Sequence, residues 1–309
     1  MTGGLNSPTN IYIWNNHSKI EKRKVDPMSR IREVSRVILS QVASDGAGVK
    51  LRRSIGSGQI SELDPFLLLD NFGTENPDDY IAGFPSHPHR GFETVTYMIE
   101  GQMRHKDSIG SEGVLGPGSV QWMTAGHGII HSEMPEQTEG RMSGFQLWVN
   151  LPAKDKMCRP RYQNIEPENV PEVELPGAKL RLIAGEVESD TGVVKGPVTG
   201  VATDPIYIDV MLEAGGAFEH AIPEGHTAFA YVFEGSVNVS GRDVAQHHLA
   251  ILGQGDHVRL SSETGGRAIL VAGRPIGEPV ARYGPFVMNT PQEIQQAVRD
   301  FQTGNFLAH

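Results

Sequence analysis

Residues 96–101 read Thr-Tyr-Met-Ile-Glu-Gly, and residues 230–235 read Ala-Tyr-Val-Phe-Glu-Gly, 134 positions later. Leu-Gly-Pro-Gly at 115–118 returns as Leu-Gly-Gln-Gly at 252–255, 137 positions later. Two matches in the same order and at nearly the same distance indicate an internal duplication. The sequence therefore predicts two halves that share one strand-turn-strand plan.

The segments around this repeat are short apolar runs separated by glycine-containing turns, as at residues 114–123 and 145–151. Such a pattern is typical of the strands of a β-sandwich or barrel. A chain of 309 residues, at roughly 150 residues per domain, is long enough for two compact domains. We expect an all-β protein with two domains.

A single helix is expected near the C-terminal end. Thr290 is followed by proline and, three residues after the threonine, by Glu293, which is the pattern of a capping box. The apolar residues that follow lie at helical spacing and form one stripe, which we expect to pack on a barrel: Ile294, Ala297, Val298 and Phe301.

The formal net charge of −10 disfavours direct binding to nucleic acid or to anionic lipid. No run of about 18 apolar residues is present to span a bilayer. Cys158 is the single cysteine, so an intramolecular disulfide is excluded. Without an apolar signal segment, we expect a cytoplasmic protein, with the polar residues 1–27 as a disordered extension.

Two histidines mark the candidate site. His87 and His89 are two residues apart where a strand begins, so their side chains lie on one side of it. His131 and Glu133 repeat this spacing further along the chain. Imidazoles and a carboxylate suit first-row metals such as iron, nickel, copper, manganese or zinc. Glu93 has the same parity if the first strand continues, so spacing leaves Glu93 and Glu133 as alternative ligands.

The second half of the chain provides an internal control. The offset of 134 places Ala221 and Pro223 opposite the first histidine pair, and the offset of 137 places Ala268 and Leu270 opposite His131 and Glu133. None of these four residues can bind a metal. We therefore expect a metal site in the first half and a scaffold in the second.

Several long motifs, in this order, resemble the pirin family, whose members are two-domain proteins of the cupin superfamily. The resemblance covers roughly residues 48–302. The motifs are RRSIG at 52–56, LDPFL at 63–67, HPHRGFETV at 87–95, QWMTAG at 121–126, HSEMP at 131–135, QLWVNL at 146–151 and GPFVMNT at 284–290.

The resemblance implies two tandem cupin (jelly-roll) β-barrels with a short C-terminal helix. We place the metal-binding domain at residues 28–165 and the domain without metal ligands at residues 166–309. The implied ligands of one iron ion are His87, His89, His131 and Glu133, so the family resemblance favours Glu133 over Glu93. His127 stands where some members have arginine, and we expect it at the mouth of the pocket or in a solvated loop.

The resemblance also implies an activity, a quercetin 2,3-dioxygenase that cleaves a flavonol with O2 and releases CO. An octahedral ion with four protein ligands keeps two open positions, which favours chemistry over a structural role. Fe(II) is the expected metal, and nickel, copper, manganese, cobalt and zinc are alternatives. Glu133 would also accept a substrate proton. The second function that the resemblance implies is a redox-sensitive iron protein that acts through partner proteins, in the nucleus if the source is eukaryotic.

Overall fold

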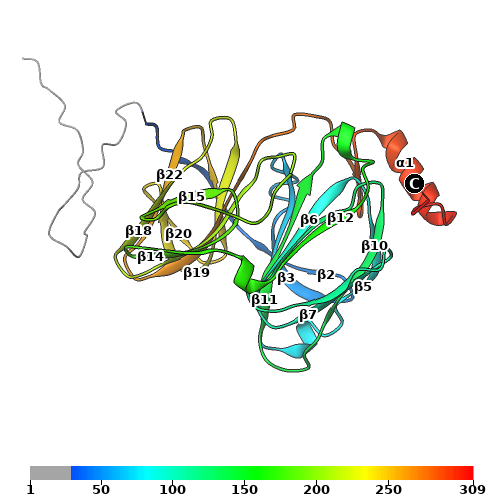
Figure 1. Ribbon diagram of the computed structural model, residues 1–309, viewed down its shortest axis with the longest axis horizontal. Coiled ribbons are helices and arrows are strands. Elements are labelled where there is room, and N and C mark those ends of the chain that lie inside the picture. The colour runs from blue at the N-terminus through cyan, green and yellow to red at the C-terminus, as the bar shows by residue number, and fades with distance from the viewer. Residues whose placement is uncertain (1–28, 309) are drawn as a thin grey trace, which may run out of the picture.

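The computed structural model describes residues 29–308 as two β-barrels side by side, with one α-helix at the C-terminal end (Figure 1). The extension predicted for residues 1–27 lies outside the described residues. The expected architecture of two cupin barrels is confirmed. None of the helices in the described part of the chain has the length and apolar character needed to cross a membrane.

The first barrel consists of a 7-stranded sheet, in the order β12-β9-β6-β11-β4-β3-β2, and a 4-stranded sheet, in the order β5-β10-β7-β8. All pairings are antiparallel. The strands are β2 (Gln41–Asp45), β3 (Val49–Ile55), β4 (Phe66–Thr74), β5 (Phe84–His89), β6 (Phe92–Glu100), β7 (Met103–Asp107), β8 (Glu112–Leu115), β9 (Val120–Thr124), β10 (Ile129–Pro135), β11 (Met142–Asn150) and β12 (Arg161–Ile165).

The second barrel repeats this plan with the path β1-β21-β19-β23-β17-β14-β13, extended by β18, β20 and β22 through the long strand β19. Its strands are β1 (Val34–Leu39), β13 (Glu172–Leu175), β14 (Ala178–Ala184), β17 (Ile206–Leu212), β18 (Gly216–Ala221), β19 (Thr227–Val239), β20 (Arg242–Ala245), β21 (His248–Leu252), β22 (His257–Ser262) and β23 (Gly266–Gly273). Small hairpins are β15 (Glu186–Ser189) with β16 (Gly192–Lys195) and β24 (Ala281–Tyr283) with β25 (Phe286–Met288), and the 3-10 turns are η1 (Pro77–Asp79), η2 (Ala153–Asp155) and η3 (Pro167–Asn169).

The predicted duplication is visible in the strand order, because β6 and β19 occupy the same place in the two seven-strand paths. Tyr97 on β6 and Tyr231 on β19 are the repeated tyrosines, and both belong to one buried apolar cluster built from both barrels. The Tyr97 hydroxyl also donates a hydrogen bond to Asp209 of the second barrel, over 2.7 Å. The repeated strands therefore form the contact between the barrels.

The strand order corrects one step of the internal control. β23, which carries Ala268 and Leu270, takes the place of β11, whereas the counterpart of β10 is β22. A single offset fails here because the loops of the two halves differ in length. The buried apolar residues of β22 are Val258 and Leu260, which pack in the apolar interior of the second barrel. Val258 lies opposite His220 of β18, a partly buried histidine of this barrel.

The two ends of the described chain cross between the barrels. β1 joins the sheet of the second barrel by pairing with β21. The C-terminal segment returns to the first barrel, where α1 (Pro291–Gln302) lies beside β10 in Figure 1. The domain boundary between residues 165 and 166 stays a prediction. The N-terminal strand β1 and the C-terminal helix α1 each pack on the barrel that this boundary assigns to the other half of the chain.

The predicted helix is confirmed together with its cap. The Thr290 side chain accepts a hydrogen bond from the Glu293 backbone, and the Glu293 side chain reaches back to the Thr290 backbone. Ala297 is fully buried in a cluster with Phe286 and Phe306, and Ile130 of β10 packs against it. The apolar stripe therefore anchors the C-terminal segment to the strand that carries His131.

Candidate metal centre

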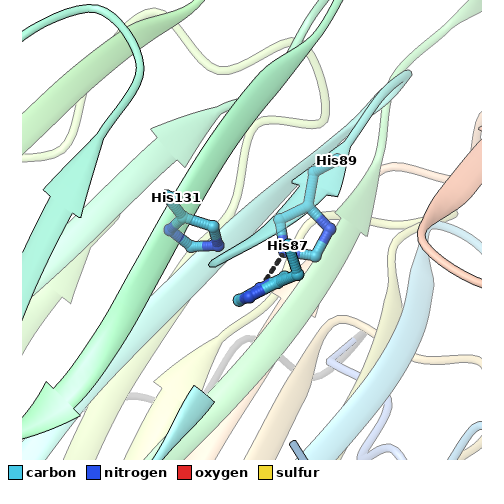
Figure 2. A group of neighbouring side chains, drawn as sticks. All are labelled: His87, His89 and His131. Carbon is cyan, nitrogen blue, oxygen red and sulfur yellow. Dashed lines mark hydrogen bonds between the residues drawn. The ribbon is translucent and has the colours of Figure 1, made fainter. Parts of the chain in front are cut away.

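Three histidines converge in the first barrel. His87 and His89 lie on β5, and the antiparallel register of β10 places His131 directly opposite His87. One ring nitrogen from each histidine lies within 4.8 Å of the other two, as the converging rings in Figure 2 show. Among residues 29–308 this is the one group of three or more such side chains with metal-binding spacing.

The surroundings of two of these rings, His89 and His131, favour the neutral form that a metal ligand requires. Burial lowers the pKa of His89 well below its ordinary value, and the neighbouring His87 adds to this effect. Burial also lowers the pKa of His131, reinforced by the other histidines around it. Neither ring nitrogen of His131 has a hydrogen-bond partner among the described residues. Nε2 of His87 and Nε2 of His89 face each other over 3.0 Å, so an ion shared between these nitrogens and the unpartnered His131 ring fits a first-row transition metal.

Glu133 lies near this cluster but outside the group with mutual 4.8 Å spacing. A register irregularity follows His131, so Glu133 pairs with Phe84 rather than with Pro85, which regular pairing would place opposite it. Its buried carboxylate accepts a hydrogen bond from the Thr96 hydroxyl over 3.0 Å. That bond occupies one carboxylate oxygen, and the assignment of Glu133 as a ligand stays a prediction.

Glu93 is not brought to the histidines. β5 ends at His89, and Gly91 turns the chain with a φ of +87° before β6 begins at Phe92, so side-chain alternation does not carry across the turn. Glu93 accepts hydrogen bonds from Trp122 over 3.1 Å and Thr124 over 2.7 Å. Its carboxylate lines a separate cavity of about 540 Å³.

Two polar residues beside the site were missed by the sequence reasoning. β7 pairs with β10 so that His105 lies opposite Glu133 and Asp107 opposite His131. Both side chains are almost completely buried. The signal was present in the sequence, because His-Lys-Asp at 105–107 places two polar side chains on one side of a strand, as His-Pro-His does at 87–89.

Aromatic side chains form one wall of the site. The His89 ring lies 5.1 Å from the Phe92 ring and 5.4 Å from the Trp148 ring, between centroids. Phe92 and Trp148 are 4.4 Å apart. The guanidinium carbon of Arg282 lies 4.7 Å from the centroid of Trp148. This wall offers apolar surface next to the histidines, with a cation behind it.

His127 is not solvated, because it is 8% exposed, and its place at the mouth of the pocket stays a prediction. Its backbone N–H donates to the carbonyl of Cys158 over 2.8 Å. Its own carbonyl accepts a hydrogen bond from Nε of Arg90. The Gly-His-Gly turn is therefore fixed through its backbone.

The C-terminal segment clamps the turn that follows His89. Arg90 is 2% exposed and pairs with Asp300 of α1 over 2.6 Å, while its guanidinium carbon lies 4.5 Å from the Phe306 centroid. Lys156 donates three hydrogen bonds, to the Gly91 carbonyl, the Val287 carbonyl and the Asn150 side chain. Two buried cations therefore tie the end of β5 to residues far away in the sequence.

Comparison with known proteins identifies relatives along most of the chain. The family model described as "Pirin" matches residues 48–149, and the one described as "Pirin C-terminal cupin domain" matches residues 207–307. A Pseudomonas aeruginosa protein provisionally named a quercetin 2,3-dioxygenase is 53% identical over 281 residues, which cover 90% of this chain and 99% of that protein. Human pirin is 43% identical over 282 residues, with 89% of this chain and 94% of that protein covered.

A solved structure shows the same architecture. The crystal structure of quercetin 2,3-dioxygenase from Acinetobacter baumannii superposes with a TM-score of 0.82 at 36% sequence identity. The match covers 90% of this chain and 99% of that chain.

Proposed function

Because the chain belongs to the pirin family of two-domain cupins, we propose that it is a metal-dependent dioxygenase that cleaves flavonols such as quercetin with O2 and releases CO. The observation that carries this proposal is the cluster of His87, His89 and His131, three imidazoles with ring nitrogens within 4.8 Å of one another. The names of relatives at 53% and 44% identity point to the same reaction.

The side chains around the cluster suit an aromatic substrate. Trp148 is partly exposed beside His89 and offers an aromatic ring against which a flavonol can pack, while the fully buried Phe92 supports it from behind. Arg282 lies over the Trp148 ring and adds positive charge near the site, which would favour a deprotonated flavonol. These groups bind and orient the substrate and exclude water from part of its surface.

His87, His89 and His131 would hold a divalent transition metal, with Fe(II) as our proposal and Glu133 as the fourth ligand. A redox-active ion held there supplies Lewis acidity toward the flavonol oxygens and electron exchange with O2. The Glu133 carboxylate would accept the proton of the 3-hydroxyl group when it partly detaches from the metal. Thr96 keeps one carboxylate oxygen in place.

The proposal is tested by anaerobic loading of the protein with Fe(II), followed by an assay of quercetin consumption and CO release in air. We expect CO to form with the loss of quercetin, and we expect both to be absent in His89→Ala. His220→Ala is the matched control, because it removes a partly buried histidine from the second barrel and leaves the cluster intact. Stoichiometric metal without turnover would contradict the enzyme and favour a metal-binding protein that acts through partners.

A further inference from the structure

Buried polar atoms without partners collect on the side of β10 away from β5. His105 on β7 is 1% exposed, and neither of its ring nitrogens has a hydrogen-bond partner among residues 29–308. In the same described part, Oδ2 of Asp107 and the hydroxyl of Tyr162 are also buried without a partner. Each such atom costs about 1–3 kcal/mol, so a cluster of them calls for a role.

The strand register places this cluster against the proposed ligands. His105 lies directly opposite Glu133 in the β7–β10 pair, where facing side chains are neighbours. The His105 ring lies 5.5 Å from the ring of His131 and 5.0 Å from that of Tyr162, between centroids. The imidazole is therefore in contact with the metal centre on one side and with Tyr162 on β12 on the other.

The groups around His105 differ in the hydrogen bonds that they can still accept, and this difference indicates which of them its ring N–H serves. Oδ1 of Asp107 accepts the backbone N–H groups of Ile109 over 2.9 Å and Ser111 over 2.8 Å, whereas its Oδ2 lies 3.6 Å from Nε2 of His105, which is too long for a hydrogen bond. The Glu133 carboxylate accepts only the Thr96 hydroxyl among the described residues. A neutral imidazole offers one donor and one acceptor, which match the carboxylate of Glu133 and the hydroxyl of Tyr162.

We propose that His105 is a positioning residue of the metal centre, whose ring N–H holds the Glu133 carboxylate toward the three histidines. Asp107 and Tyr162 pack around the ring and restrict its rotation. This inference rests on the proposed assignment of Glu133 as a ligand. Outer groups that orient metal ligands in this way change metal affinity by about 10–100-fold when they are removed.

The test measures Co(II) binding to the metal-free protein, with Kd from competition against a chelator and the d–d absorption spectrum as a second readout. In His105→Leu we expect Kd to rise about 10–100-fold and the spectrum to shift. His105→Gln, which keeps an N–H donor, should recover part of the affinity. His220→Leu removes the inward histidine of the second barrel and should leave both readouts unchanged.

A double-mutant cycle decides whether His105 acts through Glu133. In a Glu133→Gln background, we expect His105→Leu to change Kd by less than about 3-fold, because the carboxylate that it positions is gone. An unchanged Kd and spectrum in His105→Leu alone would overturn the inference, and so would an undiminished loss in the Glu133→Gln background. If His105→Leu does not fold, the cycle is read with His105→Ala.

The outcome is separable from that of the proposed function. An unchanged Kd in Glu133→Gln alone would overturn the ligand assignment and, with it, the role of His105. None of these readouts depends on quercetin turnover, so a protein that binds Co(II) as expected and cleaves no flavonol would contradict the dioxygenase and support the positioning role.

Discussion

His131 lies directly opposite His87 across the β5–β10 pair, with 4.4 Å between their ring centroids. This single cross-strand relationship joins two segments that are distant in sequence. It also places Glu133 and His105 in the next row of the sheet, where a carboxylate and a fourth imidazole meet. The metal centre is thus a property of strand register, and a shift of one residue would dismantle it.

Replacement of His89 with alanine should abolish stoichiometric metal binding and leave the fold intact. His89 supplies one of three converging nitrogens, so its loss removes a ligand. Its ring contributes little to the free energy of unfolding compared with the apolar residues packed nearby, so the fold should remain. Metal content by elemental analysis and far-UV circular dichroism check the two parts. His220→Ala should keep its metal, and undiminished metal in His89→Ala would show that the site lies elsewhere.

Substitution of the two candidate carboxylates, Glu133 and Glu93, should have different effects on metal binding. Glu133→Gln removes a charge beside the histidines, so we expect weaker metal binding and loss of flavonol cleavage. Glu93→Gln affects a carboxyl that is bonded to Trp122 and Thr124 and should keep its metal. Metal titrations of both variants make the comparison, and the opposite pattern would return the ligand role to Glu93.

The C-terminal clamp should contribute to the stability of the first barrel. Asp300→Ala leaves the guanidinium of Arg90 buried without its carboxylate, which should cost about 3 kcal/mol of unfolding free energy. Metal affinity should fall as well, because Arg90 directly follows His89. Glu219→Ala breaks the exposed pair with Arg259 and should cost less than about 1 kcal/mol in the same denaturant titration. Equal losses in the two variants would refute the clamp.

Lys156 should make stability depend on alkaline pH. Burial lowers the pKa of Lys156 from 10.5 to about 8 in the folded protein. Between these values the unfolded chain binds more protons, so the unfolding free energy should rise with pH from about 8 to 10.5, by about 3 kcal/mol in total. Below pH 8 Lys156 is protonated in both states, so the full cost of burying its charge lowers the unfolding free energy.

The check on Lys156 is a comparison of denaturation curves across that pH window. Lys156→Met should remove the rise, and Lys154→Met, which alters an exposed lysine two positions earlier, should preserve it. If the unfolding free energy of Lys156→Met rises by the same amount over this pH range, the rise comes from other groups.

The sequence was sufficient for those features that local patterns determine. The repeated Tyr97 and Tyr231 strands, the capping box at Thr290 and the paired spacing of His87 and His89 all depend on neighbours a few residues apart. The position of Glu93 was not accessible in this way, because the turn at Gly91 interrupts the alternation on which its parity depends.

Contacts between distant segments account for the remaining differences. The pairing of Arg90 with Asp300 and the hydrogen bonds of Lys156 join residues whose proximity only the fold establishes. His105 and Asp107 are an intermediate case, since their spacing was visible but their partner strand was not.

The most direct test of the central claim is the metal content of the purified protein after anaerobic incubation with Fe(II) and removal of unbound ion, measured by elemental analysis. The cluster of His87, His89 and His131 predicts one iron per chain that survives this removal. A protein that retains no iron, and no other transition metal in its place, would contradict the account.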